Sequence, residues 1–248
     1  MKTKTFRKVI EFVLAALTIT AFVIFVAISA ATRNFDLGII LAYKSRLLLG
    51  FTNTLIASGY SLIFGVILGF LLYLLRESKI YYLKSLANIF IEIMLGTPLL
   101  VLVFVTSYFI GTAFNYDNYF VLGVVAMTAY IGPYIANAFK GVIETIDEGQ
   151  FIAMDLYGFT QWQRYRYIII PQIIKPLMPP MMNNFSYIIK GTSLLYLAAV
   201  PEIFYSIKVI QSTTYAFSEG YLVLWLAYLV ITIPLSLLTK FVEKRFTQ

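Results

Sequence analysis

The amino-acid sequence predicts an all-α integral membrane protein with about six transmembrane helices. Hydrophobic residues make up 60% of the 248 residues and charged residues only 12%, and the mean hydropathy is +0.83. Soluble domains are about half apolar and a quarter charged, so this composition indicates a single helical bundle surrounded by lipid. The apolar residues also gather in runs of the length that crosses a bilayer, roughly 17–25 residues.

Six apolar runs are long enough to cross the hydrocarbon core. Glycine and proline interrupt them at Gly96, Pro98, Gly191 and Pro201, which a membrane tolerates only inside a packed bundle. The fifth run is the weakest, because it contains Lys190 and several polar residues. We expect the spans at Val9–Ala31, Leu47–Leu75, Leu86–Phe114, Tyr119–Phe139, Asn183–Val200 and Tyr221–Val242.

The first run could instead be a cleaved signal peptide. Basic residues precede it, and Ala27-Ile28-Ser29 resembles a small-residue cleavage site. Its apolar stretch of about 21 residues is longer than the 7–15 residues of a signal core, which favours a retained helix.

Lys and Arg are divided unevenly between the two sides of the predicted bundle. With the N-terminus inside, fourteen lie on the cytoplasmic side and four outside, with Lys190 in a span. Cytoplasmic loops carry the excess of positive charge, so we expect both termini in the cytoplasm. The net charge of +7 therefore reflects topology and does not indicate nucleic-acid binding. The four outer residues are Arg33, Lys44, Arg46 and Lys208.

The connection between the fourth and fifth spans, 140–182, is about forty residues long, far more than a helix–helix turn needs. Its many aromatic and aliphatic residues argue against disorder. Within it we expect a short helix over 148–156, ended by Gly158. An apolar patch on this helix must be covered by lipid headgroups or by a partner protein, and periodicity alone leaves both open. The patch consists of Phe151, Ile152 and Leu156.

The same loop carries a motif with defined spacing. From Gly149-Gln150 through Ala153 and Gly158 to Pro171, it resembles the EAA loop of ABC-transporter permeases, Glu-Ala-Ala, three residues, Gly, nine residues and Ile-x-Leu-Pro. The resemblance extends from about Leu49 to the C-terminus. Further motifs are similar to the subfamily that imports polar amino acids: Gly50 with Thr54-Leu55, Gly96-Thr97-Pro98-Leu99-Leu100, Tyr134-x-Ala136 with Lys140-Gly141, Gln172, Pro179-Pro180, Asn183 and Lys190-Gly191-Thr192-Ser193-Leu194.

Several positions depart from the family pattern. The Glu of Glu-Ala-Ala is Ile152 and its second Ala is Met154. The Arg before Gly-Thr-Pro is Leu95, the Glu after Tyr-x-Ala is Asn137, and the Asp of Lys-Asp-Thr-Ser-Leu is Gly191. Loss of the loop Glu makes the docking contact more apolar, or leaves the fuller motif to a second permease subunit. The second reading slightly favours a heterodimer over a homodimer.

The resemblance implies the type I ABC importer fold, with an added N-terminal unit (1–46) and a five-helix core (47–248) that contains the coupling loop. It implies two permease subunits, two docked ATPase subunits, and an external solute-binding protein that delivers a polar amino acid. It also implies the plasma membrane of a prokaryote. The implied docking residues are Gly149, Gln150, Phe151, Ile152, Ala153, Gly158 and Pro171.

We expect this chain to transport and not to catalyse. It has no Gly-x-x-x-x-Gly-Lys-Ser/Thr stretch to hold phosphates, so ATP and Mg²⁺ would be bound by the partner ATPase and this chain would need no cofactor. The absence of His and Cys excludes zincin motifs, Ser-His triads and disulfides, and we expect no metal site. A secondary transporter would usually show inverted repeats, and we find no clear internal repeat. An intramembrane enzyme would need buried acids, whereas all four Asp residues fall in loops.

Polar residues within the spans are candidates for a substrate path. Glu92 and Lys190 are charges in apolar runs, where a charge is a functional hypothesis by default, although the two could also pair or lie at headgroup level. The polar side chains of the fifth span could line a water-filled path or hydrogen-bond between helices. Separately, Ser61, Gly65 and Gly69 place small residues on one face of the second span, where another helix can approach closely. The candidate path residues are Glu92, Gly96, Thr97, Pro98, Asn183, Lys190, Thr192 and Ser193.

Overall fold

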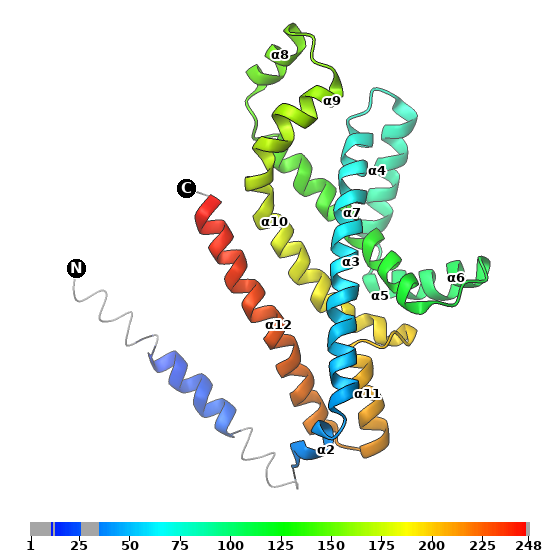
Figure 1. The fold of residues 1–248 in the computed structure, drawn as a ribbon, viewed down its shortest axis with the longest axis vertical. Helices are drawn as coiled ribbons and strands as arrows, with labels where there is room; N and C mark the ends of the chain where they lie inside the picture. The colour runs from blue at the N-terminus through cyan, green and yellow to red at the C-terminus, as the bar shows by residue number, and fades with distance from the viewer. Residues whose placement is uncertain (1–10, 12, 26–34, 247–248) are drawn as a thin grey trace.

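The structure, a computed structural model, describes residues 11, 13–25 and 35–246, and every regular element in these ranges is helical (Figure 1). Four long helices build the bundle: α3 (Lys44–Arg76), α7 (Tyr119–Ile143), α10 (Ile170–Gly191) and α12 (Phe217–Phe246). The shorter helices are α2 (Leu37–Leu41), α4 (Tyr81–Gly96), α5 (Leu99–Phe104), the π-helix η1 (Val105–Ile110), α6 (Gly111–Ala113), α8 (Glu148–Leu156), α9 (Gln161–Gln163), the π-helix η2 (Arg164–Ile169), the 3₁₀ helix η3 (Thr192–Ala198) and α11 (Ile203–Thr214).

Three helices in the described ranges are long and apolar enough to cross a membrane, and two bent pairs bring the number to as many as five. The three helices, α3, α7 and the Phe217–Val242 part of α12, correspond to the second, fourth and sixth predicted spans. The first predicted span, Val9–Ala31, falls partly outside the described residues. Within it, Val13–Phe25 forms an apolar helix that is shorter than a span.

The third predicted span is not a straight helix. It begins earlier, at Tyr81, and its two halves meet at an angle of 109° after Gly96. Pro98 causes the bend, because proline has no backbone N–H and pushes the preceding residue out of the helical region. Thr97 accordingly has an extended backbone, with φ −97° and ψ 123°.

The prediction for the fifth span and the preceding loop was wrong in extent. Helix α10 begins at Ile170 and ends at Gly191, so 170–182 is helical although it contains three internal prolines. Proline normally signals a loop, but a packed membrane bundle can satisfy the backbone groups that it frees. A separate helix, α11, then follows η3 and was not predicted. The internal prolines are Pro176, Pro179 and Pro180.

The close contact of α3 with α7 lies at the centre of the bundle, where the predicted small residues face a neighbouring helix. A Cβ atom added to Gly69 would lie 2.6 Å from Ile135 Cγ2 and 2.8 Å from the carbonyl oxygen of Gly132. One added to Gly65 would meet Ile131. The predicted close approach is therefore confirmed, and the neighbouring helix belongs to the same chain.

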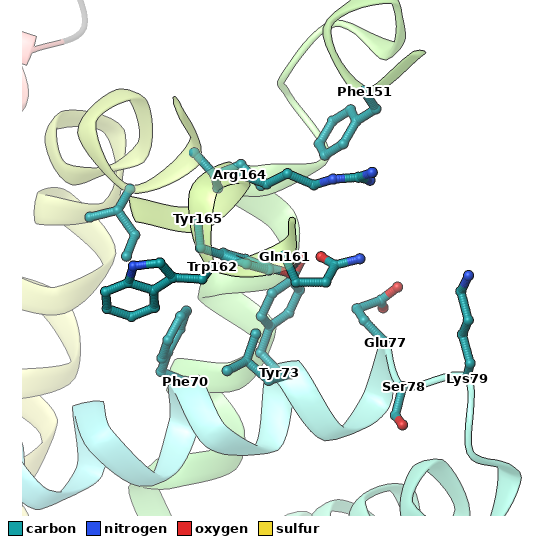
Figure 2. Close-up of a pocket in the computed structure, with 13 residues that line it drawn as sticks. Phe70, Tyr73, Glu77, Ser78, Lys79, Phe151, Gln161, Trp162, Arg164 and Tyr165 are labelled. Atoms are coloured by element: carbon teal, nitrogen blue, oxygen red, sulfur yellow. Dashed lines mark hydrogen bonds between the residues drawn. The ribbon is translucent and has the colours of Figure 1, made fainter. Parts of the chain in front are cut away.

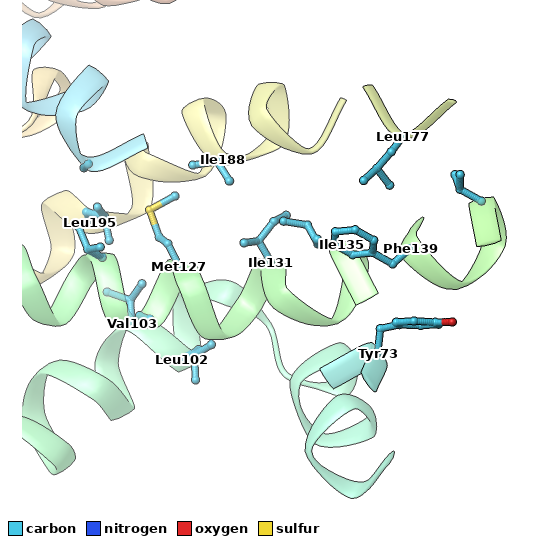
Figure 3. Packing of buried hydrophobic residues seen from close by; sticks show 14 of the residues in the cluster. Tyr73, Leu102, Val103, Met127, Ile131, Ile135, Phe139, Leu177, Ile188 and Leu195 are labelled. Carbon is cyan, nitrogen blue, oxygen red and sulfur yellow. The ribbon is translucent and has the colours of Figure 1, made fainter. Parts of the chain in front are cut away.

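The largest apolar cluster surrounds this contact and extends toward α5, α10 and η3 (Figure 3). Buried side chains from distant parts of the sequence meet in it, so this core joins α3, α5, α7, α8, α10 and η3, whereas α11 and α12 contribute to separate smaller clusters. Figure 3 labels Tyr73, Leu102, Val103, Met127, Ile131, Ile135, Phe139, Leu177, Ile188 and Leu195.

We predict that Gly69→Ala destabilises the protein, whereas Gly59→Ala on the same helix does not. The new methyl group at position 69 meets the backbone of α7, and overpacking of this kind costs about 1–3 kcal/mol. A Cβ atom at Gly59 meets nothing within 4 Å, and alanine is the better helix former. Thermal unfolding of the purified variants in detergent measures both effects. Equal midpoints for the two variants would contradict the proposed α3–α7 contact.

Candidate functional site

Helix α8 occupies the residues that the sequence predicted for a docking helix, Glu148–Leu156. Asp147 caps its N-terminus, because the Asp147 carboxylate accepts a hydrogen bond from the Gly149 backbone N–H at 2.8 Å. At the other end, Gly158 has φ +68°, the left-handed conformation that glycine adopts without strain. The Phe159 N–H donates to the Met154 carbonyl at 3.0 Å, which completes a Schellman motif.

Two polar side chains from the segment that follows α8, Gln172 and Arg164, hold the helix in place. The Gln172 side chain of α10 donates to the Gln150 side-chain oxygen at 2.9 Å. Arg164 of η2 pairs with Asp155 and also donates to the Phe159 carbonyl oxygen at 3.1 Å. Helix α8 is therefore joined to the start of α10 near its first turn and to η2 near its last turn.

The two faces of α8 differ in exposure. Met154 is 2% exposed and joins the main core cluster, whereas Ile152, Leu156 and Tyr157 are 60%, 83% and 82% exposed. Phe151 does not belong to the exposed patch as predicted, because it is half-buried and faces a cavity next to α3. Tyr157 takes its place. We define the exposed docking patch as Ile152, Leu156 and Tyr157.

The other predicted docking residues support α8 or lie at its edge. Gly149 and Gln150 are exposed in its first turn, and Ala153 is half-buried against a small cavity beneath the helix. Pro171 lies in the first turn of α10, directly after the π-helix η2. Gly158 ends α8 as expected.

We call residues 148–169, which comprise α8, α9 and η2, the docking segment. An open cavity of about 800 Å³ lies between this segment and the adjacent end of α3 (Figure 2). Phe70 and Tyr73 of α3 and Glu77 directly after it line one side, and Trp162 and Tyr165 line it from the docking segment. Two of these rings meet, since the Tyr165 hydroxyl lies 3.5 Å from the Tyr73 hydroxyl. The docking segment therefore reaches α3 across the cavity through aromatic side chains.

The structure brings the Gly96-Thr97-Pro98-Leu99-Leu100 motif next to the Lys190-Gly191-Thr192-Ser193-Leu194 motif inside the bundle. The bend at Pro98 directs Leu99 toward the end of α10, where a Cβ atom added to Gly191 would lie 3.0 Å from Leu99 Cδ2. The missing side chain at Gly191 therefore makes room for Leu99. The Thr97 hydroxyl donates to the Ile93 carbonyl at 2.6 Å, and Gly96 is exposed.

Only part of the predicted substrate path is assembled in one place. Lys190 and Ser193 line a cavity of about 320 Å³ between α10, α11 and α12. Thr192 is buried and its hydroxyl donates to the Ile189 carbonyl at 2.7 Å, so it does not face this cavity. Asn183 and Glu92 are exposed and are not among the lining residues. The remaining lining residues are Phe204, Tyr221, Leu224, Trp225 and Tyr228.

The alternative that Glu92 pairs with Lys190 is not realised. No ion pair joins these two described residues, and the Lys190 ammonium lies 5.6 Å from the centre of the Tyr187 ring. Lys190 is thus available to an anionic group that enters the cavity.

A buried carboxylate that the sequence reasoning missed lies behind this cavity. Glu202 is 0% exposed and caps α11, accepting hydrogen bonds from the backbone N–H groups of Phe204 at 2.8 Å and Tyr205 at 2.6 Å. The Tyr228 hydroxyl, in the cavity wall, lies 3.4 Å from it. An acidic residue directly before an apolar helical pattern is an N-cap signal, so the sequence could have placed Glu202 at a helix start. Its burial could not be seen there.

The start of α3 fits against this cap. The Thr54 hydroxyl accepts a hydrogen bond from the Ile203 N–H at 3.1 Å, and the Asn53 side chain donates to the Pro201 carbonyl at 2.8 Å. A Cβ atom at Gly50 would lie 2.9 Å from the Glu202 carbonyl oxygen. Gly50 and Thr54, which carry one of the sequence motifs, therefore position α11 and the wall of the cavity.

Long apolar helices, an exposed apolar patch on a short helix at one end, and a cavity that holds an ammonium and hydroxyl groups among apolar side chains are typical of a membrane transport component. The sequence profile of the binding-protein-dependent transport system inner membrane component family matches residues 61–248. The chain belongs to this family.

Relatives and solved structures agree with this assignment. The probable glutamine ABC transporter permease protein GlnM of Bacillus subtilis (strain 168) is 34% identical over 196 residues, covering 79% of this chain and 91% of GlnM. The probable amino-acid ABC transporter permease protein PatM of Vibrio harveyi is 29% identical, covering 87% and 98%. A crystal structure of an amino acid ABC transporter with histidines matches with a TM-score of 0.76 at 29% identity, covering 85% and 98%. An inward-facing MetNI methionine ABC transporter, 17% identical with a TM-score of 0.66 and coverages of 82% and 96%, shares the fold.

These comparisons confirm the predicted type I ABC importer fold and the predicted role as a permease subunit. The family consists of membrane transport components, and a separate subunit hydrolyses ATP, so the chain is not itself an enzyme. Its partners are an ATPase and a solute-binding protein. The residues that dock the ATPase and those that meet the cargo stay predictions.

We predict that Gly158→Val disorders the end of α8 and that Gly158→Asn does not. The left-handed conformation costs a β-branched residue about 1–2 kcal/mol, whereas asparagine adopts it more readily. Hydrogen exchange of the amides of 154–159 in the purified protein measures the effect, and we expect faster exchange for the valine variant alone. Equal protection in both variants would contradict the role of Gly158 in ending the helix.

Proposed function

We propose that this chain is one of two membrane-spanning subunits of an ATP-driven importer for a polar amino acid, and that it docks its ATPase through the patch Ile152, Leu156 and Tyr157. The exposure of this patch carries the proposal. Ile152 and Leu156 of one short helix and Tyr157 directly after it are exposed, while Met154 holds the opposite face of the helix in the core. A large exposed apolar patch of this kind marks an interaction site.

The position of α8 favours a protein partner over the lipid headgroups. Helix α8 lies at the far end of the bundle, beyond the ends of α3 and α7 (Figure 1). Apolar side chains at this place contact a subunit that caps the end of the bundle. The Ile that replaces the family's Glu either makes this contact more apolar or leaves the fuller motif to a second permease subunit, and the second alternative slightly favours a heterodimer.

The distribution of charge supports a cytoplasmic location for the α8 end. Arg76 ends α3, Lys79 and Lys84 flank the start of α4, and Lys140 lies in the last turn of α7, all toward the end that carries α8. Lys44 and Lys208 lie on α3 and α11 toward the opposite end. Positive charge is enriched on the cytoplasmic side, so the C-terminal end of α12 would also face the cytoplasm of a prokaryotic cell.

The cavity between α10, α11 and α12 supports a polar amino acid as cargo. The Lys190 ammonium can bind a carboxylate, and the Ser193 and Tyr228 hydroxyls lie in the same wall. A volume of about 320 Å³ with apolar walls and few polar groups is typical of a small-molecule site. The printed names of relatives, a probable glutamine permease and a probable amino-acid permease, point to the same class of cargo.

This chain itself would need no cofactor. ATP and Mg²⁺ would be bound by the two ATPase subunits, because the chain lacks a phosphate-binding loop. Its own contribution is mechanical and consists of holding the docking helix, moving with it and exposing the cavity to one side of the membrane at a time.

The docking patch is tested by Leu156→Ser, with Tyr81→Ser as the matched control. Both side chains are 83% exposed toward the same end of the bundle, but only Leu156 lies on α8. Losing a buried leucine costs about 1.5–3 kcal/mol, so we expect the cognate ATPase to be lost from the purified complex of the Leu156 variant alone. Retention of the ATPase at the wild-type level by the Leu156 variant would overturn the proposed docking patch.

The cargo cavity is tested by Lys190→Gln in proteoliposomes that contain the full transporter and its solute-binding protein. Loss of one charge-assisted hydrogen bond costs about 1.5–3 kcal/mol, so we expect uptake to fall roughly tenfold or more while the ATPase stays bound. Lys84→Gln removes the same charge from an exposed position on α4 and should leave uptake unchanged. Equal uptake by the two variants would contradict a role for Lys190 in cargo binding.

A further inference from the structure

Four aromatic rings from three separate elements meet between the docking segment and the core. Phe70 and Tyr73 come from α3, Phe139 from α7 and Tyr165 from η2. The Tyr165 ring stands edge-on to its neighbours, with centroids 6.0 Å from Phe70 at 83° and 6.5 Å from Tyr73 at 76°. Phe139 completes the cluster at 5.1 Å from Phe70. Distances of this size with edge-to-face geometry are the favourable arrangement for aromatic pairs.

Tyr165 is the member of this cluster that belongs to the docking segment. Tyr73 and Phe139 are each 6% exposed and are fixed in the core, whereas Tyr165 is half-buried. The residue next to it, Arg164, is tied to α8 through Asp155 and to the end of α8 through the Phe159 carbonyl. Arg164 contacts α8 directly and is the neighbour of Tyr165 in the chain. A displacement of α8 is therefore passed to Tyr165 through a single residue.

An open cavity lies beside the four aromatic rings. The cavity of about 800 Å³ lies between the docking segment and the end of α3; Gln161 extends toward Glu77, whereas Trp162 lies near Phe70 (Figure 2). Neither Glu77 nor Lys79 forms an ion pair within the described ranges. The aromatic rings thus form the ring-to-ring contact between the docking segment and α3, beside the aliphatic contacts that Met154 and Ile169 make with the same core cluster.

We propose that Tyr165 is a positioning residue that transmits movement of the docking helix to α3 and α7. This inference rests on the proposed docking of the ATPase at α8. When the ATPase displaces α8, η2 moves with it, and the edge of the Tyr165 ring displaces Phe70 and Tyr73. Helices α3 and α7 follow together, because the close contact at Gly65 and Gly69 prevents them from sliding separately. Helix α10 forms a second connection, which leads directly from the docking segment to Lys190.

The test compares Tyr165→Ala with Tyr167→Ala in the reconstituted transporter, with uptake and ATP hydrolysis measured on the same preparation. Tyr167 lies two residues further along the same π-helix and is 66% exposed, without a ring contact among the described residues. We expect uptake per ATP hydrolysed to fall roughly tenfold for Tyr165→Ala, since several aromatic contacts are lost, and to stay at the wild-type value for Tyr167→Ala. Tyr165→Phe, which keeps the ring edge, should restore most of the coupling.

Retention of the ATPase separates this proposal from the docking proposal. Loss of docking removes the ATPase from the purified complex. Loss of the Tyr165 ring contact leaves the ATPase bound and hydrolysing ATP without uptake. Should Tyr165→Ala yield no stable complex, Tyr165→Leu keeps the apolar volume without the ring edge and gives the same readout. Wild-type uptake per ATP in either variant would overturn the proposal, because α10 alone would then carry the movement.

A double variant provides a second test. If the Tyr165 ring acts through the Tyr73 ring, the loss of coupling in Tyr165→Ala combined with Tyr73→Leu, which removes the second ring, should not exceed the larger of the two single losses, because interacting residues are not additive. Independent, multiplying losses would show that the two rings do not act together and would contradict the proposed route.

Discussion

The close approach of α3 to α7 is the constraint on which the rest of the bundle depends. Because positions 65 and 69 of α3 are glycines, the α3 backbone lies directly against the side chains of Ile131 and Ile135 on α7. No larger residue fits at position 69 without a shift of α7. This contact places Tyr73 beside Phe139 and so builds the wall that receives Tyr165. It also brings α3 and α7 together as one unit that a movement at the α8 end can displace.

Helix α10 connects the docking end to the membrane cavity within one continuous element. Gln172 near its start bonds to Gln150 of α8, and Lys190 near its end lines the cavity. The position of its last turn is set by packing, since Gly191 leaves space for Leu99 from the bend at Pro98. Two connections therefore start at the proposed docking site. One leads through α10 directly to the proposed cargo site, and the other leads through the Tyr165 ring to α3 and α7.

Local signals in the sequence predicted much of this structure. The bounds of α8 follow from an acidic start and Gly158, which act within a few residues of the helix, and three spans follow from hydropathy alone. The start of α10 was missed because its prolines indicate a loop unless surrounding helices satisfy the backbone. The burial of Glu202 was missed because it depends on Thr54 and Tyr228, which are distant in the sequence. The inward direction of Phe151 likewise depends on α3.

The central claim is that a partner subunit covers the outer face of α8 in the assembled transporter. The chain contains no cysteine, so a cysteine introduced by Leu156→Cys is the single thiol of this subunit. Maleimide labelling of that thiol tests the claim most directly. The account predicts rapid labelling of the subunit alone and strong protection in complex with its ATPase, with no protection for Tyr81→Cys. Equal labelling of Leu156→Cys with and without the ATPase would contradict it.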